Sequence, residues 1–395
     1  MVCPAALESP PAGARCFLPP AAGSHQGLRH GRASRRDVAC QMRLPGLLSS
    51  PTPIIEAQEA FENLHALLPP FVRENFASFY SSEMGGIVLE PAAMVVPIED
   101  RMVMRGHGVY DQCLLVNGHL YQLDEHLQRL YASSRKAGLE ASVSFGELRK
   151  IILHTTAASR KLNGIVRFWL TGGRGTLGIS PKEGKGTSFY VLVSSEDKFR
   201  DIQKGVRVKT SPVPSPPPYF LTTLTNGFLP HVVATMEAES EDCEVGILVD
   251  EDGQVLGAPA ANIAMVTVDN DLVVPPHEDT VRGITMERIL TLLEKTDDPN
   301  LTVSTVVRRH FTPQEAKTAL EVFLTTTGVP VMAVTEWDGE IIAEGKPGIN
   351  TLGFNALINN DEDDVEGSSV HAEVPYGYLT GMEEEEEDEL ALRLD

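Results

Sequence analysis

The sequence predicts an α+β fold built in two parts, and three observations lead to that prediction. The chain has 395 residues, of which 42% are hydrophobic, enough to bury two cores of ordinary domain size. From about Gly85 onward, short runs with strand-like alternation are separated by turn residues and by amphipathic helical stretches. Five prolines then crowd the segment from Ser211 to Tyr219, where they remove amide donors and interrupt both patterns.

The first part is expected over residues 85–204 as a small α+β domain. Its strand-like runs are Gly86–Glu90, Leu114–Val116, Val166–Thr171 and Phe189–Ser194. A helix is expected to begin at Asp124, a residue type that caps helix N-termini, and to end near Lys136 and Gly138. Its stripe consists of Leu127, Leu130, Tyr131 and Ser134. A helical extension is expected ahead of this domain, over residues 51–84.

The second part is expected over residues 223–358 as a larger α+β domain, after a proline-rich connector over residues 205–222. Its expected elements are a helix from about Pro230 to Ser240, hairpin strands at Val245–Val249 and Gln254–Leu256, and a strand at Asn262–Val268. Thr285 can cap a further helix, and Gly283 and Ile284 lead into it. Exposed amides at such a helix start suit a phosphate group.

The two ends of the chain differ in composition from the rest. The first fifty residues contain six arginines, no lysine and only two acidic residues, Glu8 and Asp37, which is typical of an organelle transit peptide. We expect import into the chloroplast stroma, with the mitochondrion as second choice. Acidic runs at Asp361–Asp364 and Glu383–Asp388 predict a disordered tail over residues 359–395.

Charge, hydropathy and cysteine content exclude several kinds of partner. A formal net charge of −22 argues against nucleic acid, whose partners concentrate Lys and Arg on one surface. No apolar run reaches the roughly 20 residues that a membrane helix needs. Three of the five cysteines lie in the first fifty residues. The two that remain, Cys113 and Cys243, are too few for a disulfide framework or a zinc site.

Two groups of motifs carry a family resemblance. Residues 101–111 read RMVMRGHGVYD and residues 126–130 read HLQRL, while Leu229-Pro230, Asn262 and Gly283-Ile284-Thr285 follow in order. The chain thus resembles the fold-type-IV aminotransferases that depend on pyridoxal 5′-phosphate, over about residues 85–352. It looks nearest to the plant and algal branch related to D-amino-acid aminotransferase and aminodeoxychorismate lyase, with branched-chain aminotransferases as further relatives. The resemblance implies that family's two-domain architecture.

The resemblance also implies a cofactor site for pyridoxal 5′-phosphate. Its residues would be Arg129, Gly283, Ile284, Thr285, Asn262, Thr326 and Thr327. Arg129 would hold the phosphate through charge-assisted hydrogen bonds, and the amides at the helix start would take the other oxygens. From the residues alone, Arg129 can equally be an ordinary charged residue that lies away from the leucine stripe of its helix and binds no ligand.

A substrate mouth is implied by the same resemblance at Arg105, His107 and Tyr110. Arg105 would pair with a substrate carboxylate. The ligand would be a small amino acid or a chorismate-derived molecule, and the family implies a dimer. His107 lies between two glycines and can also be read as a structural turn histidine.

The chain departs from the family at two positions that carry its chemistry. Residues 224–231 read LTNGFLPH and match a motif K-S-x-N-Y-L-P-N, so Leu224 stands where the lysine that forms the Schiff base is expected. Gly257 stands where a glutamate would keep the cofactor ring nitrogen protonated. Lys209 precedes the proline segment and is a poor substitute. No residue can therefore be assigned to standard Schiff-base catalysis.

These departures favour a pseudoenzyme or regulatory partner that binds pyridoxal 5′-phosphate without a covalent link, as a homodimer or as a heterodimer with an active paralogue. The alternative is an active aminotransferase or aminodeoxychorismate lyase that uses an unorthodox base such as His231. A third reading is a fold that binds another anion or serves as an interaction scaffold. The sequence leaves open whether the protein is an enzyme.

Overall fold

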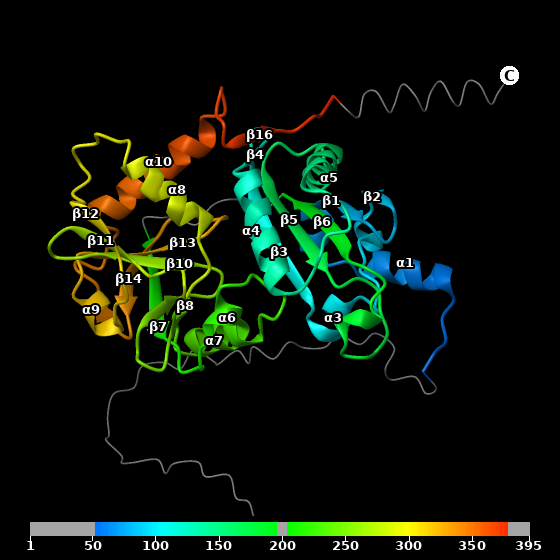
Figure 1. Ribbon diagram of the computed structural model, residues 1–395, viewed down its shortest axis with the longest axis horizontal. Coiled ribbons are helices and arrows are strands. Elements are labelled where there is room, and N and C mark those ends of the chain that lie inside the picture. The colour runs from blue at the N-terminus through cyan, green and yellow to red at the C-terminus, as the bar shows by residue number, and fades with distance from the viewer. Residues whose placement is uncertain (1–51, 196–203, 378–395) are drawn as a thin grey trace, which may run out of the picture. The chain divides into compact units, whose positions relative to one another are not determined.

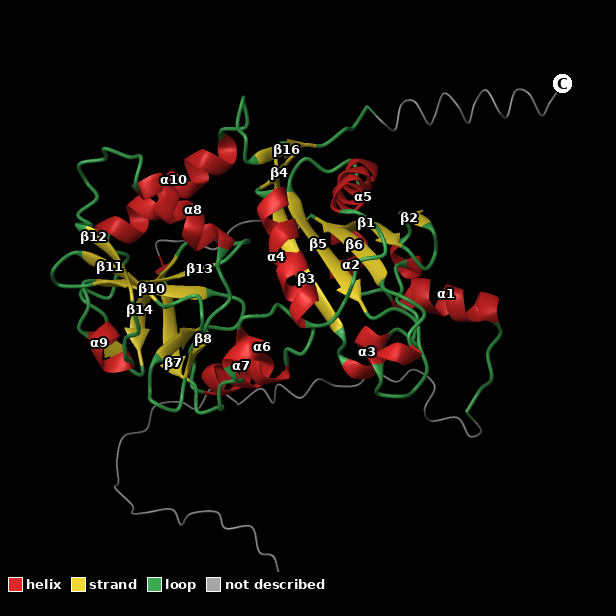
Figure 2. Cartoon of the chain, in the orientation of Figure 1, coloured by secondary structure: helices red, strands yellow, loops and turns green. Residues whose placement is uncertain are grey.

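The structure, a computed structural model, describes residues 52–195 and 204–377 (Figure 1). Residues from Glu56 onward form one compact unit in which helices and strands are mixed (Figure 2), so the predicted α+β class is confirmed. The expected transit peptide over 1–50 and the acidic run Glu383–Asp388 lie outside the described residues. Within the described residues, no helix is long and apolar enough to cross a membrane, and no cluster of His, Cys, Asp or Glu could hold a metal ion.

The first sheet is antiparallel in all its described pairings, with the strand order β16-β4-β3-β5-β6-β1-β2. Its strands are β1 (Phe76–Ser81), β2 (Gly86–Val88), β3 (Gly108–Val116), β4 (His119–Tyr121), β5 (Gly164–Thr171), β6 (Ser188–Ser194) and β16 (His371–Glu373). The helices in this part of the chain are α1 (Ala57–Leu67), α2 (Pro70–Asn75), α3 (Arg101–Arg105), α4 (Leu123–Lys136) and α5 (Phe145–Ala158), with short 3-10 turns at Pro91–Ala93 and Pro181–Glu183.

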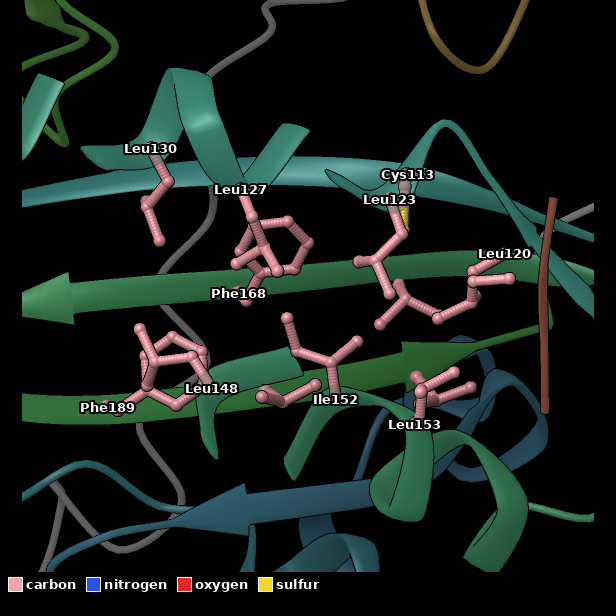
Figure 3. Packing of buried hydrophobic residues seen from close by; sticks show 14 of the residues in the cluster. Cys113, Leu120, Leu123, Leu127, Leu130, Leu148, Ile152, Leu153, Phe168 and Phe189 are labelled. Carbon is pink, nitrogen blue, oxygen red and sulfur yellow. The ribbon is translucent and has the colours of Figure 1, made fainter. Parts of the chain in front are cut away.

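Helices α4 and α5 bury their leucine and isoleucine stripes against this sheet. Leu127 is fully buried and points toward Phe168 of β5, while Leu148 and Ile152 come from α5 (Figure 3). A capping box at Ser144 and Glu147 begins α5. Because α4 is fixed on the sheet by its apolar face, the flank of the helix that carries Arg129, beside buried His126 and Ser133, has a defined direction.

The second sheet is mixed and has the strand order β12-β11-β10-β13-β14-β7-β8-β9, with β15 paired to β14. Its strands are β7 (Val206–Thr210), β8 (Val245–Val249), β9 (Val255–Gly257), β10 (Asn262–Val266), β11 (Asp271–Val274), β12 (Thr305–Arg308), β13 (Glu321–Thr325), β14 (Met332–Trp337) and β15 (Glu340–Ile341). The accompanying helices are α6 (Pro218–Leu221), α7 (Leu229–Ser240), α8 (Ile284–Leu293), α9 (Pro313–Lys317) and α10 (Ile349–Asp363).

A shared hydrophobic cluster joins the two sheets. It combines Leu114 and Ile165 from the first sheet with Ala264, Phe323 and Phe354 from the second sheet and α10. Val109 of β3 also forms an isolated β-bridge with Thr225. These contacts hold β3 and α4 next to the segment around residue 224.

Part of the expected connector is a central strand. β7 lies between β14 and β8 and pairs in parallel with both, so residues 206–210 belong to the second sheet. Pro218 begins the short helix α6, since proline is tolerated at the first position of a helix. The expectation of a connector over 205–222 is therefore wrong for these two elements, while residues 211–217, which contain four of the prolines, lie outside helices and strands.

The expected N-terminal extension and acidic tail also contain parts of the fold. Residues 76–81 form β1, which pairs with β6, so the helical extension over 51–84 is corrected there. α10 continues to Asp363, and β16 pairs with β4, so the prediction of disorder from residue 359 is wrong for residues 359–377. Asp361 is stabilised by Arg288, whose Nε donates to Oδ2 over 2.7 Å, and by the Tyr121 hydroxyl. Because Arg288 and Tyr121 are distant in sequence from Asp361, the local composition could not predict these contacts.

Two predicted helix caps are wrong. α4 begins after Gln122, which has a left-handed φ of 51°, and Asp124 pairs instead with Arg149 over 2.8 Å. α8 begins at Ile284 with Gly283 as its N-cap, and the Thr285 hydroxyl donates to the Thr326 carbonyl over 3.2 Å. In both cases a tertiary partner engages the side chain that local sequence assigned to capping.

Candidate active site

A cavity of about 970 Å³ brings together every residue that the sequence singled out for the site. Those lining residues are Arg105, His107, Tyr110, Arg129, Leu224, Gly257, Asn262, Gly283, Ile284, Thr285, Thr326 and Thr327. They come from α3, β3, α4, the segment before α7, the turn from β9 to β10, the start of α8 and the end of β13. Segments far apart in the sequence therefore meet around one space large enough for a cofactor and a substrate.

Arg129 projects from α4 at one end of this cavity, with its side chain 17% exposed. Its Nε donates to Asp111 Oδ2 over 2.8 Å, its Nη2 to Asp111 Oδ1 over 2.8 Å and its Nη1 to the Arg282 carbonyl over 3.0 Å. Its Nη2 also lies 3.4 Å from His126 Nδ1. A guanidinium carries five N–H groups, so these contacts leave at least one for an anion. Asp111 and Arg282 thus fix the orientation of a positive charge at the cavity wall.

Asp111 and His126 form a buried support for Arg129 whose role the sequence reasoning did not identify, although Asp111 ends the RMVMRGHGVYD motif. His126 Nδ1 lies 2.8 Å from Asp111 Oδ1. Burial raises the pKa of Asp111, but the charges and hydrogen bonds of Arg129 and His126 offset it and bring the pKa to about 2. Burial lowers the pKa of His126. Asp111 is therefore ionised at neutral pH and holds Arg129 in its charged, bidentate geometry.

The start of α8 forms the other side of the same end of the cavity. Gly283 is required by close packing, because a Cβ built there would lie 2.0 Å from Asn262 Oδ1. Asn262 Nδ2 donates to the Val281 carbonyl over 2.7 Å and so shapes the turn that leads into the helix. The first amides of a helix have no partner within it, and those of Ile284 and Thr285 belong to residues that line the cavity.

Thr326 supports this turn through its backbone. Its carbonyl accepts from the Thr285 hydroxyl, and its own hydroxyl lies 3.0 Å from the Val329 carbonyl. Thr325 has a buried hydroxyl without a partner among the described residues. Thr326 and Thr327 line the cavity beside the start of α8, where the sequence analysis placed them.

Arg105 and His107 lie at the cavity wall, but both side chains make contacts to backbone. The Arg105 guanidinium donates to the carbonyls of Met104 and Leu177. His107 Nε2 donates to the Ala137 carbonyl over 2.9 Å, and its Nδ1 is buried without a partner among the described residues. The Arg105 contact joins α3 to the loop after β5. The His107 contact joins the start of β3 to the end of α4, as expected of a structural turn histidine.

Tyr110 extends the wall toward the middle of the cavity. Burial raises the pKa of its hydroxyl to about 12, so the group is neutral at physiological pH. Its ring meets the ring of Phe228 edge to face, with centroids 5.4 Å apart. Together with Leu248 and Leu256, these rings give the middle of the cavity an apolar surface.

Leu224 is fixed between the two parts of the fold. Its amide donates to the Ser133 hydroxyl on α4 over 3.2 Å, and its carbonyl accepts from the amide of Tyr110 over 3.2 Å. It lines the cavity with an alkyl side chain that can neither donate a proton nor form a bond to an aldehyde. Lys209 lies on β7, pairs with Glu241 and does not line the cavity.

Gly257 ends β9 with a φ of 149°, a value that favours glycine. A Cβ built on it would lie 3.2 Å from the Ala261 carbonyl. The neighbouring Ala258 and Ala261 line the cavity as well, so no acid occupies this part of its wall in the described residues. The cavity wall around Gly257 is therefore apolar, in contrast to the wall around Arg129.

His231, named in the sequence analysis as an alternative base, and Lys136, which was not named there, also line the cavity. His231, at the start of α7, has a buried Nδ1 without a partner among the described residues, and burial lowers its pKa. Lys136, in the last turn of α4, donates to the Thr222 hydroxyl over 2.7 Å and is the lysine that lines the cavity among the described residues. The position of Lys136 seven residues after Arg129 is the signal that could have indicated it.

The donors at the two ends of this cavity decide which part of a phosphopyridoxyl group would fit. Arg129 keeps at least one N–H group, and the amides of Ile284 and Thr285 belong to residues that line the same cavity, which together suits a phosphate. Leu224 and Gly257 offer neither an amine nor a carboxylate for the ring end. The residues fit non-covalent binding through the phosphate and do not fit covalent attachment at residue 224.

Comparisons with known proteins show which family the chain resembles. The family described as amino-transferase class IV matches residues 108–337. D-amino-acid transaminase, chloroplastic, of Arabidopsis thaliana is 35% identical over 327 residues, which cover 81% of this chain and 86% of the relative. D-alanine aminotransferase of Bacillus licheniformis is 26% identical over 281 residues, 70% of this chain and 94% of that protein.

A solved structure shares the fold at lower identity. The branched-chain amino acid aminotransferase of Escherichia coli superposes with a TM-score of 0.67 at 19% identity. The match covers 76% of this chain and 99% of that chain. This similarity shows the fold, and the predicted fold-type-IV architecture is confirmed by it.

Proposed function

This chain belongs to the class IV aminotransferase family, and we propose that it is a member that binds pyridoxal 5′-phosphate without a covalent link. One observation carries the proposal: Arg129 and the start of α8 line the same cavity as Leu224 and Gly257. The groups that hold a phosphate are thus present where the groups for covalent catalysis are missing. The protein would act as a pseudoenzyme or as a regulatory partner in amino-acid metabolism.

The chain's own residues would hold the cofactor mainly by its phosphate. Arg129, kept ionised and oriented by Asp111, would supply a charged pair, and the Ile284 and Thr285 amides would supply further hydrogen bonds. Asn262 would keep the turn before α8 in the shape that exposes those amides. Tyr110, Phe228 and Leu256 would exclude water from the ring.

The bound cofactor would supply an aldehyde and an electron-accepting ring. In this chain Leu224 supplies no amine to the aldehyde carbon, and Gly257 supplies no acid that would keep the ring nitrogen protonated. Both losses act on the same chemistry, proton transfer at the substrate α-carbon. We therefore expect binding to persist while catalysis is weak or absent.

The competing function is an active aminotransferase or lyase with His231 as its base. The observation that favours it is the neutral, partner-free Nδ1 of His231 at the cavity wall, whose pKa is lowered by burial. If this function holds, His231→Asn should abolish turnover of a test amino acid while leaving cofactor affinity unchanged. Equal turnover in the wild type and in this variant would exclude His231 as the base.

Absorbance spectroscopy with added pyridoxal 5′-phosphate tests the proposed function directly. The wild type should bind the cofactor reversibly, lose it on dialysis and show no lysine-linked cofactor after borohydride treatment and peptide mapping. Pyridoxamine 5′-phosphate, which has no aldehyde, should bind with similar affinity. A cofactor fixed to Lys136 or to Lys209 would overturn the proposal and indicate an ordinary enzyme with a relocated lysine.

We extend the proposal to assembly and location. An exposed apolar stripe on α7, formed by Leu229, Val232 and Met236, supports a dimer of this chain or a heterodimer with an active paralogue. The chloroplastic name of the Arabidopsis thaliana relative supports plastid import directed by residues 1–50. Fusion of those residues to a fluorescent protein should deliver it to chloroplasts, whereas a cytosolic signal would contradict this location.

A further inference from the structure

Lys136 is a charged group at the cavity wall for which the proposed function has no role. Its Nζ donates to the Thr222 hydroxyl over 2.7 Å and lies 3.3 Å from the Thr222 carbonyl at the end of α6. The Tyr219 hydroxyl donates in turn to the Lys136 carbonyl over 2.5 Å. These contacts hold the ammonium in one direction and leave one of its three N–H donors for a ligand.

The spacing of residues on α4 relates Lys136 to the phosphate end of the site. Arg129, Ser133 and Lys136 follow one another at positions i, i+4 and i+7 and therefore share one face of the helix. The Leu224 amide donates to the Ser133 hydroxyl, which places residue 224 at the level of Ser133. Along the helix axis, Arg129 lies about 6 Å to one side of that level and Lys136 about 4.5 Å to the other.

Arg129 and Lys136 thus line the cavity on opposite sides of the level of Leu224 along α4. Apolar groups lie near that level, because the Tyr110 amide donates to the Leu224 carbonyl and the Tyr110 ring pairs edge to face with Phe228. A ligand that matches this pattern has an anion at each end and a flat, uncharged body between them. Free pyridoxal phosphate has an anion at one end only.

Arg105 is the other cation that could meet the second anion. Its guanidinium already donates to the carbonyls of Met104 and Leu177, so it holds α3 to the loop after β5. It also lies on α3 and not on the helix that carries Arg129. Lys136, in contrast, shares one face of α4 with Arg129.

We propose that Lys136 recognises the carboxylate of an amino acid joined to the phosphopyridoxyl group, so that the ligand of this site is the phosphopyridoxyl–amino acid conjugate and not the free cofactor. The proposal rests on the proposed function, since it takes the Arg129 end as the phosphate site. Leu224 fits this ligand because it cannot displace the amino acid's nitrogen from the cofactor carbon. Lys136 is here a specificity-determining residue of the binding site.

Two stable, achiral probes isolate the carboxylate: N-(5′-phosphopyridoxyl)glycine and N-(5′-phosphopyridoxyl)glycinamide, which replaces the carboxylate by a neutral amide of the same shape. Dissociation constants measured by calorimetry on the full chain give a ratio between the two probes. The wild type should bind the glycine probe about tenfold more tightly, as one charge-assisted hydrogen bond supplies. Lys136→Met should reduce the ratio to near one, and Lys136→Arg should keep most of it.

Three variants separate recognition of the carboxylate by Lys136 from a structural role and from recognition by another cation. Arg135→Met removes a neighbouring cation in the same helical turn that does not line the cavity, so the ratio should persist. Thr222→Val removes the hydroxyl contact of Lys136 while keeping the ammonium, so a persisting ratio excludes a purely structural role. Arg105→Met should leave the ratio of the two dissociation constants unchanged. If the ratio falls to near one in Arg105→Met but stays near ten in Lys136→Met, the proposal is overturned.

The outcomes also separate this inference from the proposed function. If the wild type binds both probes equally well and Arg129→Ala weakens both, the phosphate site stands and the role of Lys136 is wrong. If neither probe binds, or if Arg129→Ala changes nothing, the proposed function itself fails. An equal loss of affinity for both probes in Lys136→Met would likewise overturn the recognition of the carboxylate.

Discussion

Asp111 accepts two hydrogen bonds from Arg129, from Nε to Oδ2 over 2.8 Å and from Nη2 to Oδ1 over 2.8 Å. The Asp111 side chain is completely buried. β3 provides the carboxylate and α4 the guanidinium, so the pair depends on the packing of that helix against the sheet. Arg129 also lines the cavity. This pair connects the stability of the fold to the site proposed for the phosphate.

Arg129→Ala should weaken the binding of pyridoxal 5′-phosphate at least tenfold, about 1.4 kcal/mol, because a phosphate at a helix start needs a charged partner to compete with water. Fluorescence or calorimetric titration measures the change. Arg135→Ala is the matched control, since it removes an arginine of the same helix that does not line the cavity. An unchanged dissociation constant in Arg129→Ala would place the phosphate elsewhere.

Asp111→Asn should destabilise the protein by about 3 kcal/mol, because it leaves the charge of Arg129 partly buried without its counter-ion. Urea unfolding of the two proteins at pH 7 measures this difference. Asp124→Asn provides a control, since Asp124 makes a half-exposed pair with Arg149. A smaller effect at Asp111 than at Asp124 would contradict the assigned importance of the buried pair.

The contribution of Asp111 should also depend on pH in a defined direction. Its folded-state pKa is about 2, below the ordinary value of 3.8, so its stabilisation is complete above about pH 4 and is lost as pH falls toward 2. The stability difference between wild type and Asp111→Asn should therefore narrow over that window. A difference that stays constant from pH 7 to pH 2 would show that the carboxylate's charge is not the cause.

Leu224→Lys should create a lysine that borohydride fixes to the cofactor, because residue 224 lines the cavity between Tyr110 and Ser133. Adding Gly257→Glu should improve slow transamination of a test amino acid by restoring an acid for the ring nitrogen. Peptide mapping detects the first effect and a coupled assay the second. Leu224→Met is the control that keeps the size of the side chain without an amine.

The second change in that pair carries a structural penalty. Gly257 has a φ of 149°, and a Cβ there would approach the Ala261 carbonyl to 3.2 Å, so Gly257→Glu should lower stability by roughly 1–3 kcal/mol. Gly257→Ala should show a similar loss, since the backbone and the Cβ cause it. If Gly257→Ala is as stable as the wild type, backbone strain at this position is refuted.

Removal of residues 1–50 should leave the melting temperature within about 1 °C of the full chain. The buried hydrophobic clusters of the described residues begin at Phe79, and the compact unit begins at Glu56. Calorimetry of both forms measures the change, and loss of cooperative melting on truncation would refute the reading of these residues as a transit peptide. Removal of residues 1–85 is the matched comparison, because it deletes β1 from the first sheet and should destabilise the protein.

Several features of the fold follow from local patterns in the sequence. The runs around Val166–Thr171 and Phe189–Ser194 lie in β5 and β6, and the leucine stripe of α4 packs on the sheet, because alternation and helical periodicity describe which side of an element is apolar. Motif resemblance likewise singled out residues that line one cavity, from Arg105 to Thr327. Leu224 and Gly257 could be noticed only because the surrounding motif remained readable.

Tertiary structure alone decided which of these side chains have partners. Asp361, assigned by composition to a solvated tail, pairs with Arg288, and Asp124, expected to cap a helix, pairs with Arg149. Arg105, expected to face a carboxylate, donates to backbone carbonyls, while Lys136 reaches the cavity. The physical reason is that periodicity fixes the direction of a side chain relative to its own helix or strand, whereas its charge is satisfied by groups that only the packing of distant segments brings within hydrogen-bond distance.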